Sequence, residues 1–229
     1  MPKERPSPTI EDYLRAIYGL KGEGETVISA RLARRMRVTP PTAWATVRRM
    51  ARDSLVQLDA KKAVDLTPKG LEWAENIVRR HRLAERFLTD VLGFGWAEVH
   101  EEAHRFEHFI TPRIEERMVV AAGNPITCPH GSPIPGTSAK LPEDLVPLDR
   151  LSAGDEATVE FVSEELEEDL DALCYLERGG VMPGRRLTVL EVAPSARVLV
   201  VAVDGVQVPL GLAIAARIRV RRHSVNAAS

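Results

Sequence analysis

The sequence predicts a mainly α-helical protein with small β parts, in which a winged helix-turn-helix is followed by a helical domain and an SH3-like β-barrel. Apolar residues recur at helical spacing through most of the first 108 residues. Two short alternating segments interrupt this pattern at 55–66, and several more follow residue 148. We therefore expect the winged helix-turn-helix at 1–75, the helical domain at 76–124, a proline-rich linker at 125–147 and the barrel at 148–222.

The composition is that of a globular protein without a membrane span. The chain has 229 residues, 44% of them hydrophobic, and a formal net charge of −2. Its longest strictly apolar run, at 198–203, is far shorter than the roughly 18 residues that cross a bilayer. Its 2 cysteines are too few for a disulfide framework in a chain of this length. These features predict a cytoplasmic protein with no membrane partner.

Three helices are expected in the N-terminal domain. Apolar residues between 10 and 20 follow helical spacing after the candidate cap residues Ser7 and Thr9, and glycines at 22 and 24 end this first helix. A second helix at 29–36 and a third at 41–53 are separated by a short turn, with Thr39 as the cap of the third helix. This spacing is typical of a helix-turn-helix.

A β-wing is expected directly after the third helix. The segments 55–58 and 63–66 alternate like two short strands around a turn at 59–62. In a winged helix the third helix enters the major groove and the wing contacts the DNA backbone. The first 75 residues carry 14 Lys and Arg against 10 Asp and Glu, which permits a nucleic-acid partner without requiring one. A protein-binding winged helix stays open as the alternative. The candidate DNA contacts are Ser29, Thr39, Pro40, Pro41, Thr42, Ala45, Arg48, Arg49, Lys61 and Lys62.

A long helix at 69–89 should carry the pair His81 and Glu85, which are spaced four residues apart and so lie on one helix face. Such a pair is either a surface salt bridge or half of a metal site. The segment that follows is rich in large apolar residues, more than two helices need for their own packing. We expect a dimer interface here, with plain core as the alternative; the residues are Phe87, Leu88, Val91, Leu92, Phe94 and Trp96.

The segment 99–108 (VHEEAHRFEH) has the spacing of metal ligands. At about 100° per residue, His100, His104, Glu107 and His108 fall within about 100° of one helix face, which predicts a metal site. The letters His100-Glu101-x-x-His104 also match the H-E-x-x-H helix of zinc hydrolases, in which the glutamate is the general base. Charged residues within and beside the motif disfavour this second interpretation, but it stays open.

The expected linker and barrel add further candidate ligands. Six of the 16 prolines fall within 125–147, and Cys128 and His130, two residues apart, can chelate one ion. Alternating segments at 157–162, 186–192, 197–203 and 214–220, with a helix at 169–178, predict the barrel. An acidic run follows the first of these strands. By register, Glu164 is the residue of this run that we expect to donate a ligand, with a solvated acidic face as the alternative.

Four motifs in this order resemble the diphtheria-toxin-repressor and manganese-transport-regulator family of metal-dependent transcriptional repressors. They are EDYL at 11–14, RHRLAER at 80–86, the histidine-rich segment at 99–108, and GSPIPG at 131–136. The resemblance covers roughly residues 9–136. It implies a homodimeric, non-enzymatic repressor that binds a double-stranded palindromic operator, with a helical metal-binding and dimerisation domain and a C-terminal SH3-like (FeoA-like) domain.

The resemblance also implies two metal ions per subunit. One site would use Asp12, His104, Glu107 and His108, and the other would draw on His81, Glu85 and His100. Some manganese-type members use a pair like Cys128 and His130 for this second site, with the glutamate equivalent to Glu85 and an acid from the C-terminal domain, for which Glu164 is our candidate by register. Iron-type members have Met at the position of Asp12 and Cys at that of His104. The oxygen and nitrogen donors here favour Mn2+, with Fe2+ as the alternative. A zinc metallohydrolase and a metal sensor that acts through a protein partner stay as alternative functions.

Overall fold

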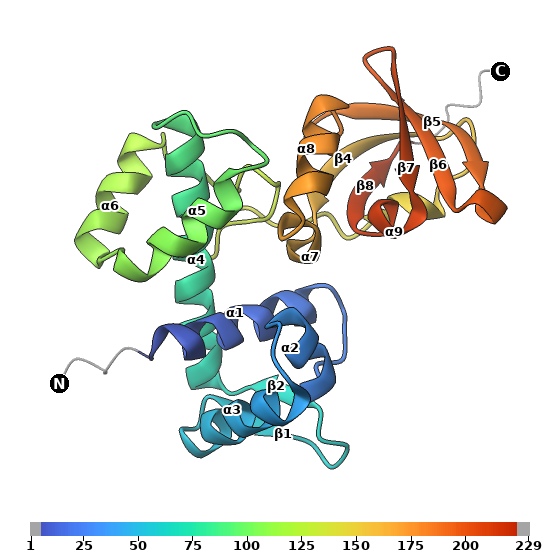
Figure 1. Ribbon diagram of the computed structural model, residues 1–229. Helices are drawn as coiled ribbons and strands as arrows, with labels where there is room; N and C mark the ends of the chain where they lie inside the picture. The colour runs from blue at the N-terminus through green and yellow to red at the C-terminus, as the bar shows by residue number, and fades with distance from the viewer. Residues whose placement is uncertain (1–5, 224–229) are drawn as a thin grey trace. The chain divides into compact units, whose positions relative to one another are not determined.

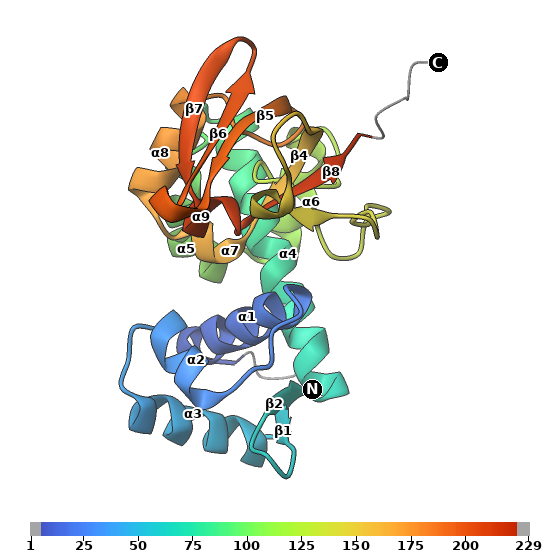
Figure 2. The same ribbon diagram turned by 90° about the vertical axis from the view of Figure 1, so that its right-hand side faces the viewer.

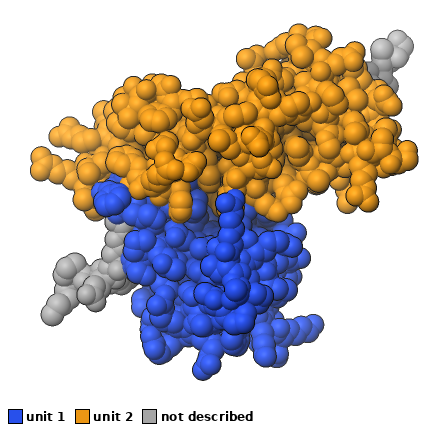
Figure 3. All heavy atoms as spheres, viewed as in Figure 1, with its two compact units in different colours: residues 1–81, 107–110 blue, residues 82–106, 111–229 orange. Residues whose placement is uncertain are grey.

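A computed structural model of the chain describes residues 6–223 (Figure 1). The described residues form two compact units (Figure 3). Unit 1 extends to His81 and also contains Glu107–Ile110, whereas unit 2 contains Arg82–Phe106 and the chain from Thr111 onward. The division falls inside the long helix α4, Pro68–Asp90. Among the described residues, no helix has the length and apolarity needed to cross a membrane.

Unit 1 has the predicted winged helix-turn-helix (Figure 2). Its elements are α1 (Pro8–Gly22), α2 (Ser29–Arg35), α3 (Pro40–Arg52), β1 (Val56–Leu58), β2 (Val64–Leu66) and the first half of α4. Thr39 caps α3, since its side chain accepts a hydrogen bond from Thr42 N, and Pro40 occupies the first turn, where its missing N–H costs nothing. The helices α2 and α3 each end one residue earlier than predicted.

The core of unit 1 is built from the apolar face of each helix. Leu14 and Ile17 of α1, Leu32 of α2 and Val47 of α3 are fully buried together. The start of α4 closes on the wing at Gly70, where a Cβ would lie 1.8 Å from the carbonyl oxygen of Leu55. Because any larger residue would push these backbones apart, Gly70 is required for this close approach.

Unit 2 begins with the second half of α4 and two further helices. These are α5 (Val99–Phe106) and α6 (Pro112–Ala121). The prediction that His100, His104, Glu107 and His108 share one helix face is wrong, because α5 ends at Phe106 and a 3-10 turn, Glu107–Phe109, follows. Thr111, the cap of α6, has an extended ψ of 159° before Pro112, and a residue before proline disfavours the helical conformation. Of the candidate ligands, His100 and His104 lie on α5, whereas Glu107 and His108 lie on the 3-10 turn.

The C-terminal part of unit 2 is a six-stranded antiparallel sheet with strand order β3-β8-β4-β5-β6-β7 (Figure 1). Its apolar side packs against Leu173 and Leu176 of α8 in one buried core. The elements are β3 (Val146–Pro147), β4 (Glu156–Val162), α7 (Glu164–Glu167), α8 (Leu170–Arg178), β5 (Arg186–Ala193), β6 (Val198–Val203), β7 (Val206–Gly211), α9 (Leu212–Ala215) and β8 (Ile218–Arg222).

Two details of this sheet differ from the sequence prediction. The predicted strand at 214–220 is wrong in its first part, since α9 extends to Ala215 and β8 begins only at Ile218. The strand β7 was not predicted and contains Pro209. It lies at the edge of the sheet, where a residue without an N–H is tolerated. Local pattern could not reveal which strand would become the edge.

The proline-rich segment 125–147 is not simply an unpacked linker. Within unit 2, Cys128, His130 and Ile134 are only 1%, 0% and 2% exposed. An isolated β-bridge joins Thr127 to Pro133, which folds the segment 127–134 into a tight loop. Burial of the Ile134 side chain favours packing of this segment, which its proline-rich sequence did not indicate. We call residues 127–134 the docked loop.

The apolar residues that we expected at a dimer interface are partly buried in the core and partly exposed. Trp96 is buried in the core of the C-terminal sheet, and Leu88 is buried as well. Val91, Leu92 and Phe94 are exposed. The exposed residues remain candidates for a dimer interface, whereas Trp96 is part of the core.

Candidate metal centres

Unit 1 gathers a small set of candidate ligands. Asp12 projects from α1, and Glu107 and His108 project from the 3-10 turn. Their ligand atoms lie within 4.8 Å of one another. His108 Nε2 is 3.4 Å from Asp12 Oδ1 and 3.6 Å from Glu107 Oε1. One imidazole nitrogen therefore faces two carboxylates, which is an arrangement that suits a divalent cation.

A buried ion pair orients the histidine of this centre. Glu11 Oε2 lies 2.9 Å from His108 Nδ1, and Arg80 Nη2 donates to Glu11 Oε1 at 3.2 Å. A carboxylate held by an arginine accepts, so His108 Nδ1 carries the proton and Nε2 keeps its lone pair for an ion. His81 Nδ1 is likewise 2.5 Å from Glu107 Oε2. The sequence prediction gave no role to Glu11 or Arg80; the available signal was a charged residue at a buried position of α1.

His104, the fourth ligand expected here, lies in the last turn of α5 in unit 2 and is half-buried. It precedes Glu107 by three residues along the chain. Its role as a ligand of the same ion stays a prediction.

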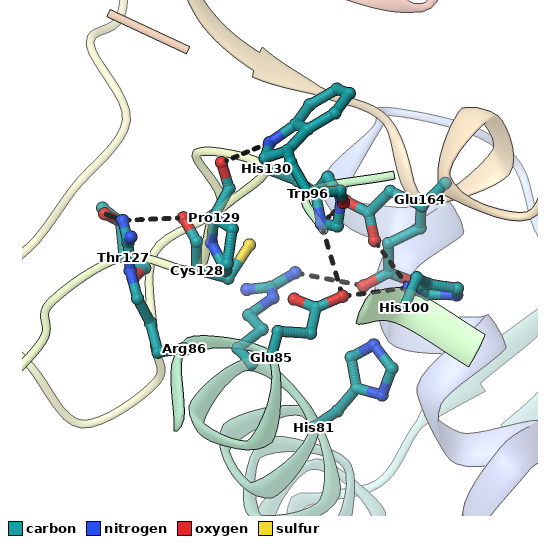
Figure 4. A network of polar contacts seen from close by, with 12 residues as sticks. His81, Glu85, Arg86, Trp96, His100, Thr127, Cys128, Pro129, His130 and Glu164 are labelled. Atoms are coloured by element: carbon teal, nitrogen blue, oxygen red, sulfur yellow. Dashed lines mark hydrogen bonds and ion pairs between the residues drawn. The ribbon is translucent and has the colours of Figure 1, made fainter. Parts of the chain in front are cut away.

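Unit 2 contains a second and more deeply buried set of donors (Figure 4). Glu85 comes from α4, His100 from α5, Cys128 and His130 from the docked loop, and Glu167 from α7. His100 Nδ1 is 3.0 Å from Glu85 Oε1 and 3.1 Å from Glu167 Oε2. His130 Nδ1 is 3.3 Å from the same oxygen of Glu85. Two histidines from different segments, His100 and His130, thus face the same oxygen of Glu85.

The backbone sets the tautomer of His130. Its Nε2 is 3.0 Å from the carbonyl oxygen of Trp96, and a carbonyl can only accept, so Nε2 carries a proton and Nδ1 faces the carboxylates of the cluster. Within residues 6–223, neither His130 Nδ1 nor Glu167 Oε1 has a hydrogen bond, although both are buried. Buried polar atoms are nearly always paired. These two atoms therefore fit a site for a cation.

The pKa values in this cluster have the directions expected where a metal competes with protons. Burial raises the pKa of the Cys128 thiol to about 11, and the charge of Glu85 adds to this effect. Burial opposes protonation of His130, but the carboxylates of Glu167 and Glu85 outweigh it and raise its pKa well above the ordinary value. Protons therefore compensate the buried carboxylates, and a divalent ion would displace them on binding.

Two arginines of α4 hold the docked loop in place. Arg86 donates from Nε to Thr127 O at 2.8 Å and from Nη2 to Cys128 O at 3.3 Å (Figure 4). Arg82 Nη1 donates to Pro133 O at 2.6 Å. These contacts place Cys128 and His130 at the cluster through protein hydrogen bonds alone.

Arg82 also explains why Glu167 faces His100, whereas the sequence predicted Glu164 as the acidic ligand. Arg82 Nη2 donates to Glu164 Oε1 at 3.1 Å, so Glu164, the residue expected from register, forms an ion pair with a buried guanidinium. Glu167, three residues later and on the same short helix, faces His100 instead. The acidic run predicted an acid from this segment, but the choice among its members depends on Arg82, which is distant in the sequence.

Replacing Arg86 by Lys is expected to loosen the docked loop, because an ammonium cannot reproduce the fork that binds two successive carbonyls. Amide hydrogen exchange of residues 127–134 should become faster by about 5- to 10-fold, as the loss of roughly one net hydrogen bond implies. Arg105→Lys, at an exposed position in ion pairs with Glu101 and Glu102, is the matched control and should change nothing in this segment. Unchanged exchange in both variants would show that Arg86 does not hold the loop.

The candidate DNA contacts lie on one exposed face of unit 1. Thr42, Ala45, Arg48 and Arg49 of α3 are exposed, whereas Ala43, Val47 and Met50 on the opposite face are buried. Ser29 is half-buried at the start of α2, and Thr39, Pro40, Pro41, Lys61 and Lys62 are exposed. Lys62 lies 5.7 Å above the ring of Trp44, and Asp59 accepts from the amides of Lys61 and Ala63, which shapes the wing. The arrangement suits a helix that enters a DNA groove.

The geometry does not support a hydrolase. Glu101 would have to be a general base beside a metal, but its side chain is 66% exposed and forms an ion pair with Arg105. His100, the first histidine of the H-E-x-x-H motif, instead faces Glu85 and Glu167.

The chain matches three protein-family profiles along its length. Residues 7–64 match "Iron dependent repressor, N-terminal DNA binding domain", and residues 67–136 match "Iron dependent repressor, metal binding and dimerisation domain". Residues 146–222 match the FeoA domain.

Individual proteins are similar over most of the chain. The iron-dependent repressor IdeR of Mycobacterium tuberculosis is 42% identical over 204 residues, which cover 84% of this chain and 88% of that protein. The diphtheria toxin repressor of Corynebacterium glutamicum is 36% identical over 190 residues, covering 80% of this chain and 83% of that protein.

Solved structures agree with this similarity. A manganese-dependent transcriptional repressor in complex with manganese superposes with a TM-score of 0.81 at 36% identity, covering 92% of this chain and 98% of that chain. ScaR with bound Zn2+ superposes with a TM-score of 0.76 at 29% identity, covering 94% of this chain and 99% of that chain.

Proposed function

The chain belongs to the family of iron-dependent repressors, and from this membership we propose that it represses transcription as a homodimer on palindromic operator DNA. It is a metal-dependent DNA-binding protein, not an enzyme. In this proposal the co-repressor is Mn2+, with Fe2+ as the alternative, and the protein acts in the cytoplasm. The observation that carries the proposal is that Asp12, Glu107 and His108 converge in the unit whose α3 presents the exposed basic face.

The donors in unit 1 support a hard divalent ion. Asp12 and Glu107 offer carboxylate oxygens and His108 offers Nε2, without a sulfur ligand among them. Carboxylate and imidazole donors suit Mn2+ and Fe2+, whereas thioether and thiolate donors favour softer ions. We propose His104 as the fourth ligand, which would keep the set to oxygen and nitrogen.

The proposed switch acts through α1. Without a metal, the carboxylates of Asp12 and Glu107 repel each other, which opposes the hydrogen bond between Glu11 of α1 and His108 of the 3-10 turn. With the ion held by Asp12, Glu107 and His108, α1 is restrained, and its residues Leu14 and Ile17 carry that restraint into the core that supports α2 and α3. Restraint of this kind favours one orientation of the recognition helix.

The buried cluster in unit 2 is the second proposed centre of each subunit. Glu85, His100, Cys128 and His130 are its ligands in this proposal, together with Glu167 in place of Glu164, which faces Arg82. We keep His81, one helical turn before Glu85 on α4, as a further candidate ligand.

Exposed apolar side chains of unit 2 support the homodimer. A hollow of about 450 Å³ is lined by Phe87, Phe106, Thr111, Arg113, Ile114, Arg117, Met118 and Ala121. Val91 and Leu92, in the turn after α4, and Val120 of α6 are also exposed. Exposed apolar patches mark association surfaces, and the matching family domain is one of metal binding and dimerisation.

A gel shift with the gene's own upstream DNA, in Mn2+ and in chelator, tests the proposed function. A repressor gives a shifted band with Mn2+ that chelator removes. A sensor that acts through a protein partner gives no shift in either condition. A zinc hydrolase would instead lose peptidase turnover on Glu101→Gln, a result that would overturn the proposal.

Replacing Asp12 by Met is expected to change the metal selectivity of DNA binding. The concentration of Mn2+ needed for half-maximal binding should rise more than that of Ni2+ or Co2+, because a thioether suits softer ions. Asp12→Glu, which keeps the carboxylate, is the control and should preserve the order of the metals. An unchanged Mn2+ response in Asp12→Met would mean that Asp12 is not a ligand.

A further inference from the structure

We propose that Arg34, in the last turn of α2, and Arg37, in the turn that follows, bind phosphates of the operator. These contacts extend the DNA-binding surface beyond α3 and the wing. The inference rests on the proposed function, because it presumes that unit 1 binds double-stranded DNA. It adds two residues that the sequence analysis did not include among the candidate DNA contacts.

The helix-turn-helix concentrates a positive charge that the chain as a whole lacks. Residues 26–52 contain seven arginines and no lysine, aspartate or glutamate, whereas the formal net charge of the whole chain is −2. A basic surface of this kind attracts the phosphate backbone of DNA. Arginine suits phosphate better than lysine does, because its planar guanidinium can donate two parallel hydrogen bonds to one phosphate group.

The ion pairs of unit 1 show which of these arginines are available to DNA. Arg31 pairs with Glu25 at 2.8 Å, and Arg52 pairs with Asp53 at 3.2 Å. Four other arginines of the segment are exposed, and among residues 6–223 no carboxylate forms an ion pair with any of them. They are Arg34, Arg37, Arg48 and Arg49. An exposed guanidinium without a carboxylate partner keeps its donors for a phosphate.

Arg37 occupies a backbone position that usually belongs to glycine. The N–H of Arg37 donates to Arg34 O at 3.1 Å and that of Val38 donates to Ala33 O at 2.9 Å, which is the hydrogen-bond pair of a Schellman motif. Arg37 has a φ of +51°, a left-handed conformation that disfavours residues with a Cβ. Local backbone stability therefore does not favour arginine here, and disfavoured conformations of this kind cluster at functional sites.

The positions along the chain place arginines at both ends of the exposed face of α3. Arg37 precedes the cap residue Thr39 by two residues, a span of at most about 7 Å. Arg48 follows Thr39 by nine residues, which corresponds to about 14 Å along the helix. The major groove is about 12 Å wide. Phosphates on both sides of the groove are thus within reach of arginines when Thr42 and Ala45, which lie between them, face the bases.

The test measures how operator binding in Mn2+ depends on salt, because each phosphate contact releases counterions. The decisive variant is Arg37→Asn, since asparagine tolerates the left-handed conformation and removes the guanidinium. Its melting temperature should stay that of the unaltered protein. Its operator affinity should fall by about 10-fold or more. The slope of log K against log[salt] should become shallower by about 0.9 per subunit, or about 1.8 per dimer.

Matched variants separate a phosphate contact from general effects of charge and backbone. Arg37→Lys keeps the charge and should keep the slope, and Arg34→Gln should make it shallower as Arg37→Asn does. Arg197→Asn is the first control, because Arg197 is also exposed and has a similar φ of +55° in unit 2. Arg31→Gln is the second control, on α2 but in an ion pair with Glu25. Neither control should change the slope.

Phosphates carry no sequence information, so both arginine variants should lose the same factor on operator and on unrelated DNA. A loss confined to the operator, or an unchanged slope in either variant, would overturn the assignment of that arginine. No Mn2+-dependent binding by the unaltered protein would instead contradict the proposed function, so the two failures are distinguishable. Arg37→Gly, which suits the same backbone conformation, replaces Arg37→Asn if melting curves show that the latter fails to fold.

Discussion

Removing the divalent ion with a chelator is expected to weaken the binding of this protein to its operator by about 5- to 150-fold, a coupling free energy of about 1–3 kcal/mol. The physical reason is that the ion joins Asp12 of α1 to Glu107 and His108 of the 3-10 turn and cancels the repulsion between the two carboxylates. Fluorescence anisotropy with labelled operator DNA, titrated at constant ionic strength in Mn2+ and in chelator, measures the change.

His108→Ala should remove most of this metal effect, since it deletes the nitrogen that faces both carboxylates. The control is His223→Ala. Among the described residues, His223 is the one histidine that is not a candidate ligand, and it lies beside Thr158 of β4. Equal operator affinity with Mn2+ and with chelator in the unaltered protein would contradict metal activation.

Replacing Gly131 by Ala is expected to lower the free energy of unfolding by about 2–5 kcal/mol, the largest stability effect that we predict. Gly131 has a φ of +93°, and a Cβ there would lie 2.0 Å from Glu160 O and 2.9 Å from Phe161 Cα. These atoms belong to the backbone of β4 and cannot rotate away. The docked loop must therefore lift, which also withdraws Cys128 and His130 from the cluster and weakens metal binding in unit 2.

The matched control for this change is Gly154→Ala. Gly154 has a similar φ of +89°, but a Cβ there would meet nothing within 4 Å. It carries only the backbone cost, about 1 kcal/mol. Thermal unfolding and Co2+ titration of both variants measure the difference, which isolates the close approach of Gly131 to β4. Equal losses of stability in the two variants would contradict this explanation.

The sequence alone determined the features that depend on local physics. Helical periodicity, the Thr39 cap and the prolines at 40 and 41 predicted the helix-turn-helix to within a residue at each end. Alternation around residues 59–62 predicted the wing. Ligand-type side chains at short spacing marked Glu107, His108, Glu85, His100, Cys128 and His130, and the family resemblance added Asp12; the structure gathers them in two clusters. Residue type and spacing carry this information before any folding occurs.

Only the tertiary structure decided which members of these patterns meet. Glu167 rather than Glu164 faces His100, because Arg82 of the distant helix α4 forms an ion pair with Glu164. Glu11 and Arg80 orient His108 through a buried pair whose members are 69 positions apart in the chain. The proline-rich segment docks because two arginines and Trp96 bind its carbonyls. Each outcome depends on contacts between residues that are far apart in the sequence. A local sequence pattern does not show which of the possible contacts forms.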